Sequence, residues 1–154
     1  MKTLQTGEKL YEALKILVEL TKFAQNNFTN QSHLSLRQWA KEFCTINLRV
    51  PRRSGHDYCI AQFLKDNPDL CPVIFCASQN MIEIMKNEIL KNRVNNKIIF
   101  CHPNGDWSNL RGIEIDCIIC NCFSLFPANK IDKIYDFGSL HIESNPNFLY
   151  IFVG

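Results

Sequence analysis

The sequence has no long hydrophobic run, and this absence excludes whole classes of protein. Its longest apolar stretches fall far short of the roughly 20 residues that a membrane-spanning helix needs. The chain opens with Met1, Lys2, Thr3 and charged residues, without the apolar segment that directs secretion. It also contains no internal repeat and no low-complexity tract. With 154 residues, the chain has the length of one domain, and we expect a cytoplasmic protein that has no membrane partner.

The chain also lacks an excess of charge of either sign. Lys and Arg number 17 and Asp and Glu number 15, so the net charge of +2 does not by itself indicate a nucleic-acid partner. The positions of the cations are more informative, because several concentrate before and within one loop: Arg37, Lys41, Arg49, Arg52 and Arg53. Two interpretations stay open, a solvated basic surface and a contact with nucleic acid.

Cysteine, in contrast, is abundant, with eight residues. In a chain without a secretion signal we expect reduced, mostly buried thiols and no metal site. Cys120 and Cys122 face one side of a predicted strand and Cys117 faces the other, so the three cannot readily share one zinc ion. A Cys-His hydrolase built on Cys122 is a formal alternative, although no recognisable nucleophile motif surrounds any cysteine.

The spacing of apolar residues predicts alternating helices and strands. Helices are predicted at residues 8–24, 36–43, 57–64, 79–92 and 129–137, and strands at residues 46–50, 73–77, 97–101, 116–122 and 148–153. This order predicts a three-layer, doubly wound α/β fold with a mostly parallel sheet. Residues 1–33 form an N-terminal amphipathic helix and polar linker, which packs on the domain or on a partner, and residues 34–154 form the α/β domain.

The most informative stretch runs from Ile46 to Tyr58, where a strand leads into a short loop and then into a helix. This order builds an anion site in parallel α/β proteins, because the amide groups at a helix N-terminus point at the loop. A phosphate-binding P-loop needs the pattern G-x-x-x-x-G-K-[ST]. Here Val50, His56 and Asp57 stand in place of the first glycine, the lysine and the hydroxyl residue. The order of elements therefore indicates a P-loop, whereas the residue types do not.

Taken together, residues 34–154 resemble the ATPase core of P-loop motor proteins, especially phage terminase large subunits and superfamily 2 helicases. The resembling segments are Leu36 to Trp39, Val50 to Asp57, Cys76 to Gln79, Ile115 to Phe123 and Phe148 to Gly154. The resemblance implies a P-loop NTPase-like fold from a virus or mobile element, and hence the host cytoplasm as location. It also implies ATP or ADP as the candidate ligand, with these contact residues: Gln38, Arg52, Arg53, Ser54, Gly55, His56 and Asp57.

The resemblance fails at the positions that carry out hydrolysis. On this alignment Asn121 replaces the Mg²⁺-binding aspartate and Cys122 replaces the glutamate that activates water. Phosphoryl transfer depends on a metal ion and cations that neutralise charge, and Asp57 would repel phosphate. We therefore expect a degenerate, non-catalytic module that acts through a protein partner, a second copy or nucleic acid. The alternative is an active DNA-packaging or helicase-like ATPase completed by a partner subunit.

A structural interpretation of the same loop also stays open. In it Asp57 is a helix cap and Arg52 and Arg53 are ordinary surface residues.

Overall fold

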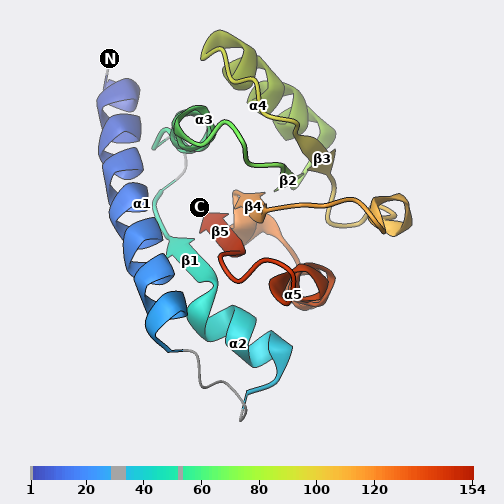
Figure 1. The fold of residues 1–154 in the computed structure, drawn as a ribbon. Helices are drawn as coiled ribbons and strands as arrows, with labels where there is room; N and C mark the ends of the chain where they lie inside the picture. Colours follow the sequence, from blue (N-terminus) through green and yellow to red (C-terminus); the bar gives the residue numbers. More distant parts are fainter. Residues whose placement is uncertain (1, 29–33, 52–53) are drawn as a thin grey trace.

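Five parallel strands form the centre of the molecule (Figure 1). The computed structural model describes residues 2–28, 34–51 and 54–154. The strands are β1 (Thr45–Leu48), β2 (Pro72–Cys76), β3 (Ile99–Cys101), β4 (Cys117–Asn121) and β5 (Leu149–Val153). Their order across the sheet is β1-β5-β4-β2-β3, and every neighbouring pair is parallel. The prediction of an α/β fold with a mostly parallel sheet is therefore confirmed.

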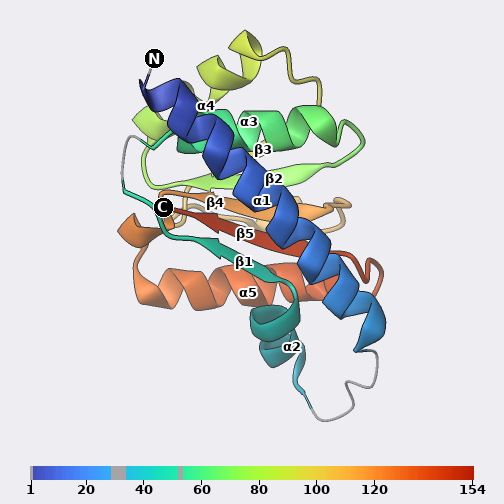
Figure 2. The ribbon, with the colours of Figure 1, turned by 90° about the vertical axis from the view of Figure 1, so that its left-hand side faces the viewer.

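Helices cover both faces of this sheet (Figures 1 and 2). One face carries α1 (Lys2–Asn27), α3 (His56–Asp66) and α4 (Gln79–Lys91), and the other carries α2 (Leu36–Phe43) and α5 (Ala128–Ile142). The chain crosses the sheet in one direction from β1 to β3 and returns from β3 to β5. The helices α3 and α4, which connect β1 to β2 and β2 to β3, lie on one face, and α5, which connects β4 to β5 in the opposite direction, lies on the other. These three crossovers therefore have the same hand, as connections between parallel strands normally do.

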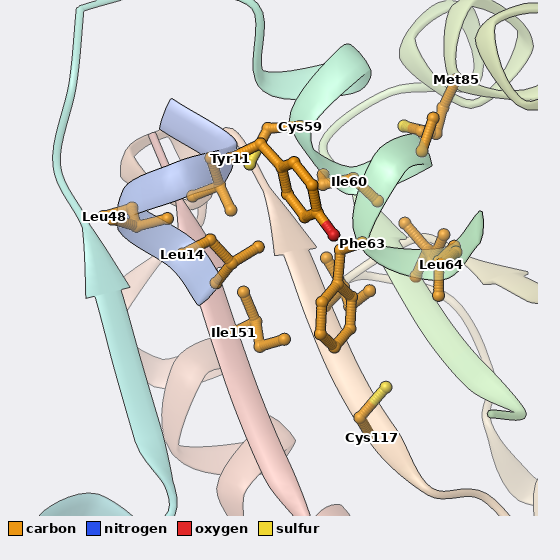
Figure 3. Packing of buried hydrophobic residues seen from close by; sticks show 14 of the residues in the cluster. Tyr11, Leu14, Leu48, Cys59, Ile60, Phe63, Leu64, Met85, Cys117 and Ile151 are labelled. Carbon is orange, nitrogen blue, oxygen red and sulfur yellow. The ribbon is translucent and has the colours of Figure 1, made fainter. Parts of the chain in front are cut away.

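The strands in the middle of the sheet are continuous apolar runs because both of their faces are covered. Every residue of β2, β4 and β5 is buried. Cys117 packs on the side of α1, α3 and α4, whereas Cys120 packs on the side of α2 and α5, as the alternation of a strand predicts. Figure 3 shows the cluster of buried residues on the side of α1, α3 and α4, in which Leu14, Ile60 and Ile151 bring together α1, α3 and β5.

Of the two partners predicted for the N-terminal helix, the domain is the one observed. Leu10, Leu14 and Val18 of α1 are buried in the cluster shared with α3 and the sheet. The Tyr11 hydroxyl donates a hydrogen bond to the Asp66 carboxylate at the end of α3. The predicted boundary at residue 33 falls outside the described residues. Neither α1 nor any other described helix is both long and apolar enough to cross a membrane.

Several element ends differ from the predicted ones, for tertiary reasons. α1 begins at Lys2 rather than at residue 8. α5 continues to Ile142, past the predicted end at residue 137. Gly138 lies inside this helix rather than at its end, and its lack of a side chain leaves room for Tyr150 to pack against the helix. β4 ends at Asn121 rather than at Cys122, because Cys122 has a φ of 55° in the left-handed region and cannot continue a strand.

Candidate functional site

The carboxyl ends of the five parallel strands meet at one edge of the sheet, where ligands bind in folds of this kind. Asn121, the last residue of β4, is paired with Cys76 of β2 and with Val153 of β5. The Gly154 amide donates a hydrogen bond to the Leu48 carbonyl at 2.8 Å, which ties the end of β5 to the end of β1. The helix α3 begins at this edge after the loop from β1. These strand ends and the start of α3 form the candidate site.

The start of α3 differs from the capping hypothesis. Gly55 is the N-cap residue, with a φ of 83° that favours glycine, and it is preceded by the half-buried Ser54. The helix begins at His56, and its N-cap residue, Gly55, provides no side-chain cap. The interpretation of Asp57 as a helix cap is therefore wrong. Arg52 and Arg53 lie outside the described residues, so their proposed contacts with phosphate stay predictions.

Asp57 instead forms a hydrogen bond with Asn121, the residue that replaces the Mg²⁺-binding aspartate of the family that the sequence resembles. The Asn121 Nδ2 amide donates a hydrogen bond of 2.6 Å to Asp57 Oδ1. Asn121 is only 1% exposed, and its Nδ2 also lies 3.7 Å from the sulfur of Met85. Burial raises the pKa of Asp57, the bond from Asn121 opposes this rise, and the Glu88 carboxylate adds to it. The pair thus joins α3 to β4 through polar groups that satisfy each other.

His56 contacts Cys122, the residue that replaces the water-activating glutamate of that family. Its Nδ1 lies 3.6 Å from Cys122 Sγ, and this sulfur is also 3.7 Å from Asn121 Oδ1. His56 is only 6% exposed. Burial lowers the pKa of His56, while the Asp57 carboxylate and nearby backbone carbonyls of the preceding loop oppose this change. The neutral imidazole is therefore favoured near neutral pH, and its Nδ1 faces the Cys122 thiol.

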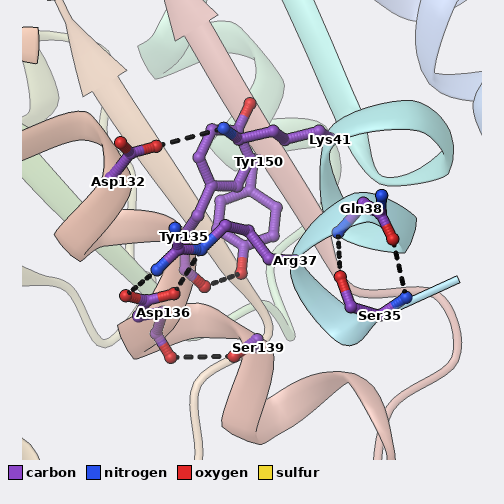
Figure 4. Close-up of polar contacts among 9 residues, drawn as sticks. All are labelled: Ser35, Arg37, Gln38, Lys41, Asp132, Tyr135, Asp136, Ser139 and Tyr150. Atoms are coloured by element: carbon purple, nitrogen blue, oxygen red, sulfur yellow. Dashed lines mark hydrogen bonds and ion pairs between the residues drawn. The ribbon is translucent and has the colours of Figure 1, made fainter.

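Gln38 does not join this site. Its backbone amide donates to Ser35 Oγ at 3.2 Å, and its side-chain oxygen accepts from the Ser35 amide at 3.0 Å (Figure 4). This capping box makes Ser35 the N-cap of α2. Because α2 precedes β1, Gln38 lies at the amino end of the sheet, away from Asp57. The structure does not bring it to the predicted nucleotide loop.

Two of the five concentrated cations already have acidic partners. Arg37 makes a bidentate pair with Asp136, and Lys41 Nζ lies 3.0 Å from Asp132 Oδ1 (Figure 4). Both pairs form because α2 packs against α5, a contact that sequence spacing does not reveal. The basic surface around the loop is therefore smaller than the sequence suggests.

A cavity of about 400 Å³ at the same edge was not predicted from the sequence. Its lining residues are Arg49, Val50, Pro51, Phe123, Ser124 and Gly154. They follow β1, β4 and β5, so the rule that parallel strand ends share an edge was the available signal. The Arg49 guanidinium lies 5.8 Å from the centre of the Phe123 ring. Among the residues that the structure describes, the cavity therefore combines a cation with an aromatic wall.

Within residues 2–28, 34–51 and 54–154, no group of three or more His, Cys, Asp or Glu side chains converges as metal ligands do. No protein-family model, curated protein or solved structure matches the chain.

Proposed function

We propose that this chain is a non-catalytic P-loop NTPase-like module that acts by binding other macromolecules. The observation that carries the proposal is the hydrogen bond between Asn121 and Asp57. In the family that the sequence resembles, the equivalent positions supply a carboxylate and a hydroxyl for Mg²⁺. Here the Asn121 amide donates a hydrogen bond of 2.6 Å to the Asp57 carboxylate, so an amide donor stands where that family has a carboxylate ligand.

The charges at the edge also support a site without turnover. The Asp57 carboxylate lies in the first turn of α3, where it interacts with the positive end of the helix that a phosphate would otherwise use. In the part of the chain that the structure describes, no lysine or arginine forms an ion pair with Asp57. Efficient phosphoryl transfer depends on cations to neutralise developing charge. This arrangement therefore opposes hydrolysis.

A nucleotide titration tests the proposal directly. We expect the purified chain to release no phosphate from ATP above the buffer rate, with or without Mg²⁺, because its edge carries Asn121 and Cys122. Isothermal titration calorimetry with ATP and ADP measures binding separately, and a phosphate-release assay measures turnover. The matched variant Asp57→Asn removes the repelling charge, so any nucleotide affinity is expected to rise in this variant. Mg²⁺-dependent turnover by the purified wild type would overturn the proposal and show that the chain is itself an active ATPase.

The outer face of α1 supports an interaction with protein, including a second copy. Ile16, Leu20 and Phe23 recur at helical spacing and are 59%, 59% and 65% exposed. They lie away from the buried Leu10 and Leu14, so α1 presents one apolar face to the domain and a second one outward. Apolar side chains grouped on one exposed face mark an association site. We therefore include self-association through this face in the proposed function.

The double variant Leu20→Glu with Phe23→Glu tests this face. We expect the wild type to self-associate with rising concentration and the variant to stay monomeric at concentrations at least about tenfold higher, since charge disfavours burial of the face. Sedimentation velocity measures the association. The change Glu12→Gln with Glu19→Gln, on exposed positions of the same helix, serves as the control and is expected to retain it. A wild type that is monomeric at all concentrations would remove self-association from the proposal.

A further inference from the structure

The eight cysteines differ sharply in their environments. Five are buried: Cys44, Cys59, Cys76, Cys117 and Cys120. Three are partly exposed: Cys71, Cys101 and Cys122. Burial raises the pKa of Cys101 to about 11, and burial together with the Asp116 carboxylate raises the pKa of Cys71. Among these three, Cys122 is the one whose sulfur lies against a histidine.

The backbone presents Cys122 at a sharp turn. Its φ of 55° and ψ of 46° place it in the left-handed region directly after β4, where few residues other than glycine are found. Gly154 packs closely on this turn. A Cβ added to Gly154 would lie only 2.7 Å from Cys122 Cα. Such strained residues persist only where the surrounding structure holds them, and they concentrate at functional sites. The turn takes the thiol out of the strand alternation and directs it to His56.

His56 is oriented to accept the thiol proton. Its Nδ1 is the ring nitrogen that lies 3.6 Å from Cys122 Sγ. Its Nε2 is buried. Burial disfavours the imidazolium that would form, whereas the carboxylate of Asp57, the next residue along α3, and the backbone carbonyls of Pro51 and Val50 favour it. Proton transfer from sulfur to nitrogen therefore gives a thiolate beside a cation, the form of cysteine that reacts.

The neighbouring cavity supplies a contact for a negatively charged molecule. Phe123 and Ser124 follow Cys122 in the chain, and Gly154 touches its backbone. Arg49 contributes the cationic side chain of the cavity, and it is exposed. A guanidinium suits recognition of a carboxylate because it offers several donors in one plane. The cavity volume of about 400 Å³ lies within the range of small-molecule sites.

We propose that Cys122 is a reactive thiol that forms a mixed disulfide with small, carboxylate-bearing disulfides, with His56 as proton acceptor and Arg49 as the carboxylate contact. Cys122 Sγ gives its proton to His56 Nδ1, and the thiolate attacks one sulfur of the small disulfide. A new bond forms to Cys122 as the old sulfur–sulfur bond breaks, and the released thiolate takes the proton from His56. The small disulfide is the oxidant. This inference does not depend on the proposed binding function.

Oxidised glutathione is the probe for this inference. The reduced full chain is incubated with it, quenched with acid and mapped by mass spectrometry, so that rates at Cys122, Cys71 and Cys101 are measured in one sample. We expect Cys122 to react at least about tenfold faster than either of the other two thiols, which act as internal controls. His56→Gln is expected to slow Cys122 at least about tenfold and to leave Cys71 and Cys101 unchanged.

Two further measurements keep the inference testable if His56→Gln fails to fold. The first repeats the wild-type reaction in urea, where selectivity for Cys122 is expected to disappear; selectivity retained in urea would overturn the role of His56. The second compares oxidised glutathione with the uncharged 2-hydroxyethyl disulfide in Arg49→Gln. We expect this change to slow only the charged probe, and equal effects on both would overturn the carboxylate contact. Equal rates at the three thiols of the native chain would overturn the whole inference.

Discussion

Gly138→Ala is expected to destabilise the protein by about 2 to 3 kcal/mol, although alanine usually stabilises a helix relative to glycine by about 1 kcal/mol. A Cβ at this position would clash with the Tyr150 hydroxyl oxygen and would lie 2.7 Å from Ile118 Cδ1. Tyr150 is fully buried, and its hydroxyl donates to the Tyr135 carbonyl at 2.9 Å. Tyr150 and Ile118 are both fully buried, so moving either side chain aside disturbs the packing of the core. Urea unfolding followed by circular dichroism measures the loss.

A second substitution separates overpacking from a general effect on the helix. Tyr150→Phe removes the oxygen that the new methyl group meets, so we expect it to recover part of the stability lost in Gly138→Ala. Ser139→Ala, at the next position of α5, is the control, and its effect is expected to stay within about 1 kcal/mol. Unchanged or increased stability of Gly138→Ala would mean that α5 does not approach β5 as described.

Asn121→Asp is expected to destabilise the protein by about 2 to 4 kcal/mol near pH 8, because it places two carboxylates together at a largely buried point. The substitution restores the acidic residue that the resembling family carries. However, the hydrogen bond of 2.6 Å that Asn121 donates to Asp57 becomes a contact between like charges. Burial already raises the pKa of Asp57, and a second carboxylate raises it further.

The sign of the pH dependence follows from that rise. Carboxyl groups with a raised pKa bind protons more tightly in the folded state, so the variant loses stability as the pH rises above the ordinary carboxyl value of about 4. Lowering the pH from 8 to 5.5 is therefore expected to recover part of the loss, as measured by urea unfolding at each pH. The swapped variant Asp57→Asn with Asn121→Asp keeps one charge and one amide, and we expect it to be more stable than Asn121→Asp alone. Equal stability of these two variants would show that the contact does not determine the effect.

Much of the fold could be predicted from the sequence because periodicity and burial are linked. The continuous apolar runs that became β2, β4 and β5 are buried throughout, and only a sheet covered on both faces requires such runs. The ends of elements were less predictable. Gly138 normally favours the end of a helix, yet α5 passes through it because Tyr150 occupies the space beside it.

The site was predictable only in part. The sequence singled out His56, Asp57, Asn121 and Cys122 by their disagreement with a motif, and in a parallel sheet residues that follow the strands lie at one edge. Their contacts with one another were not foreseen. Gln38 was expected near the same loop, but its local bonds with Ser35 are made at the other end of the sheet.

The sequence by itself determined the alternation of helices and strands, the parallel sheet and the residue types at the ends of β1 and β4, because these depend on apolar spacing and chain order. Only the tertiary structure decided which polar groups meet. The left-handed turn at Cys122 and the start of α3 after Gly55 set the directions of Cys122 and His56. Contacts of this kind depend on a few backbone angles and on the approach of distant segments, which sequence spacing does not encode.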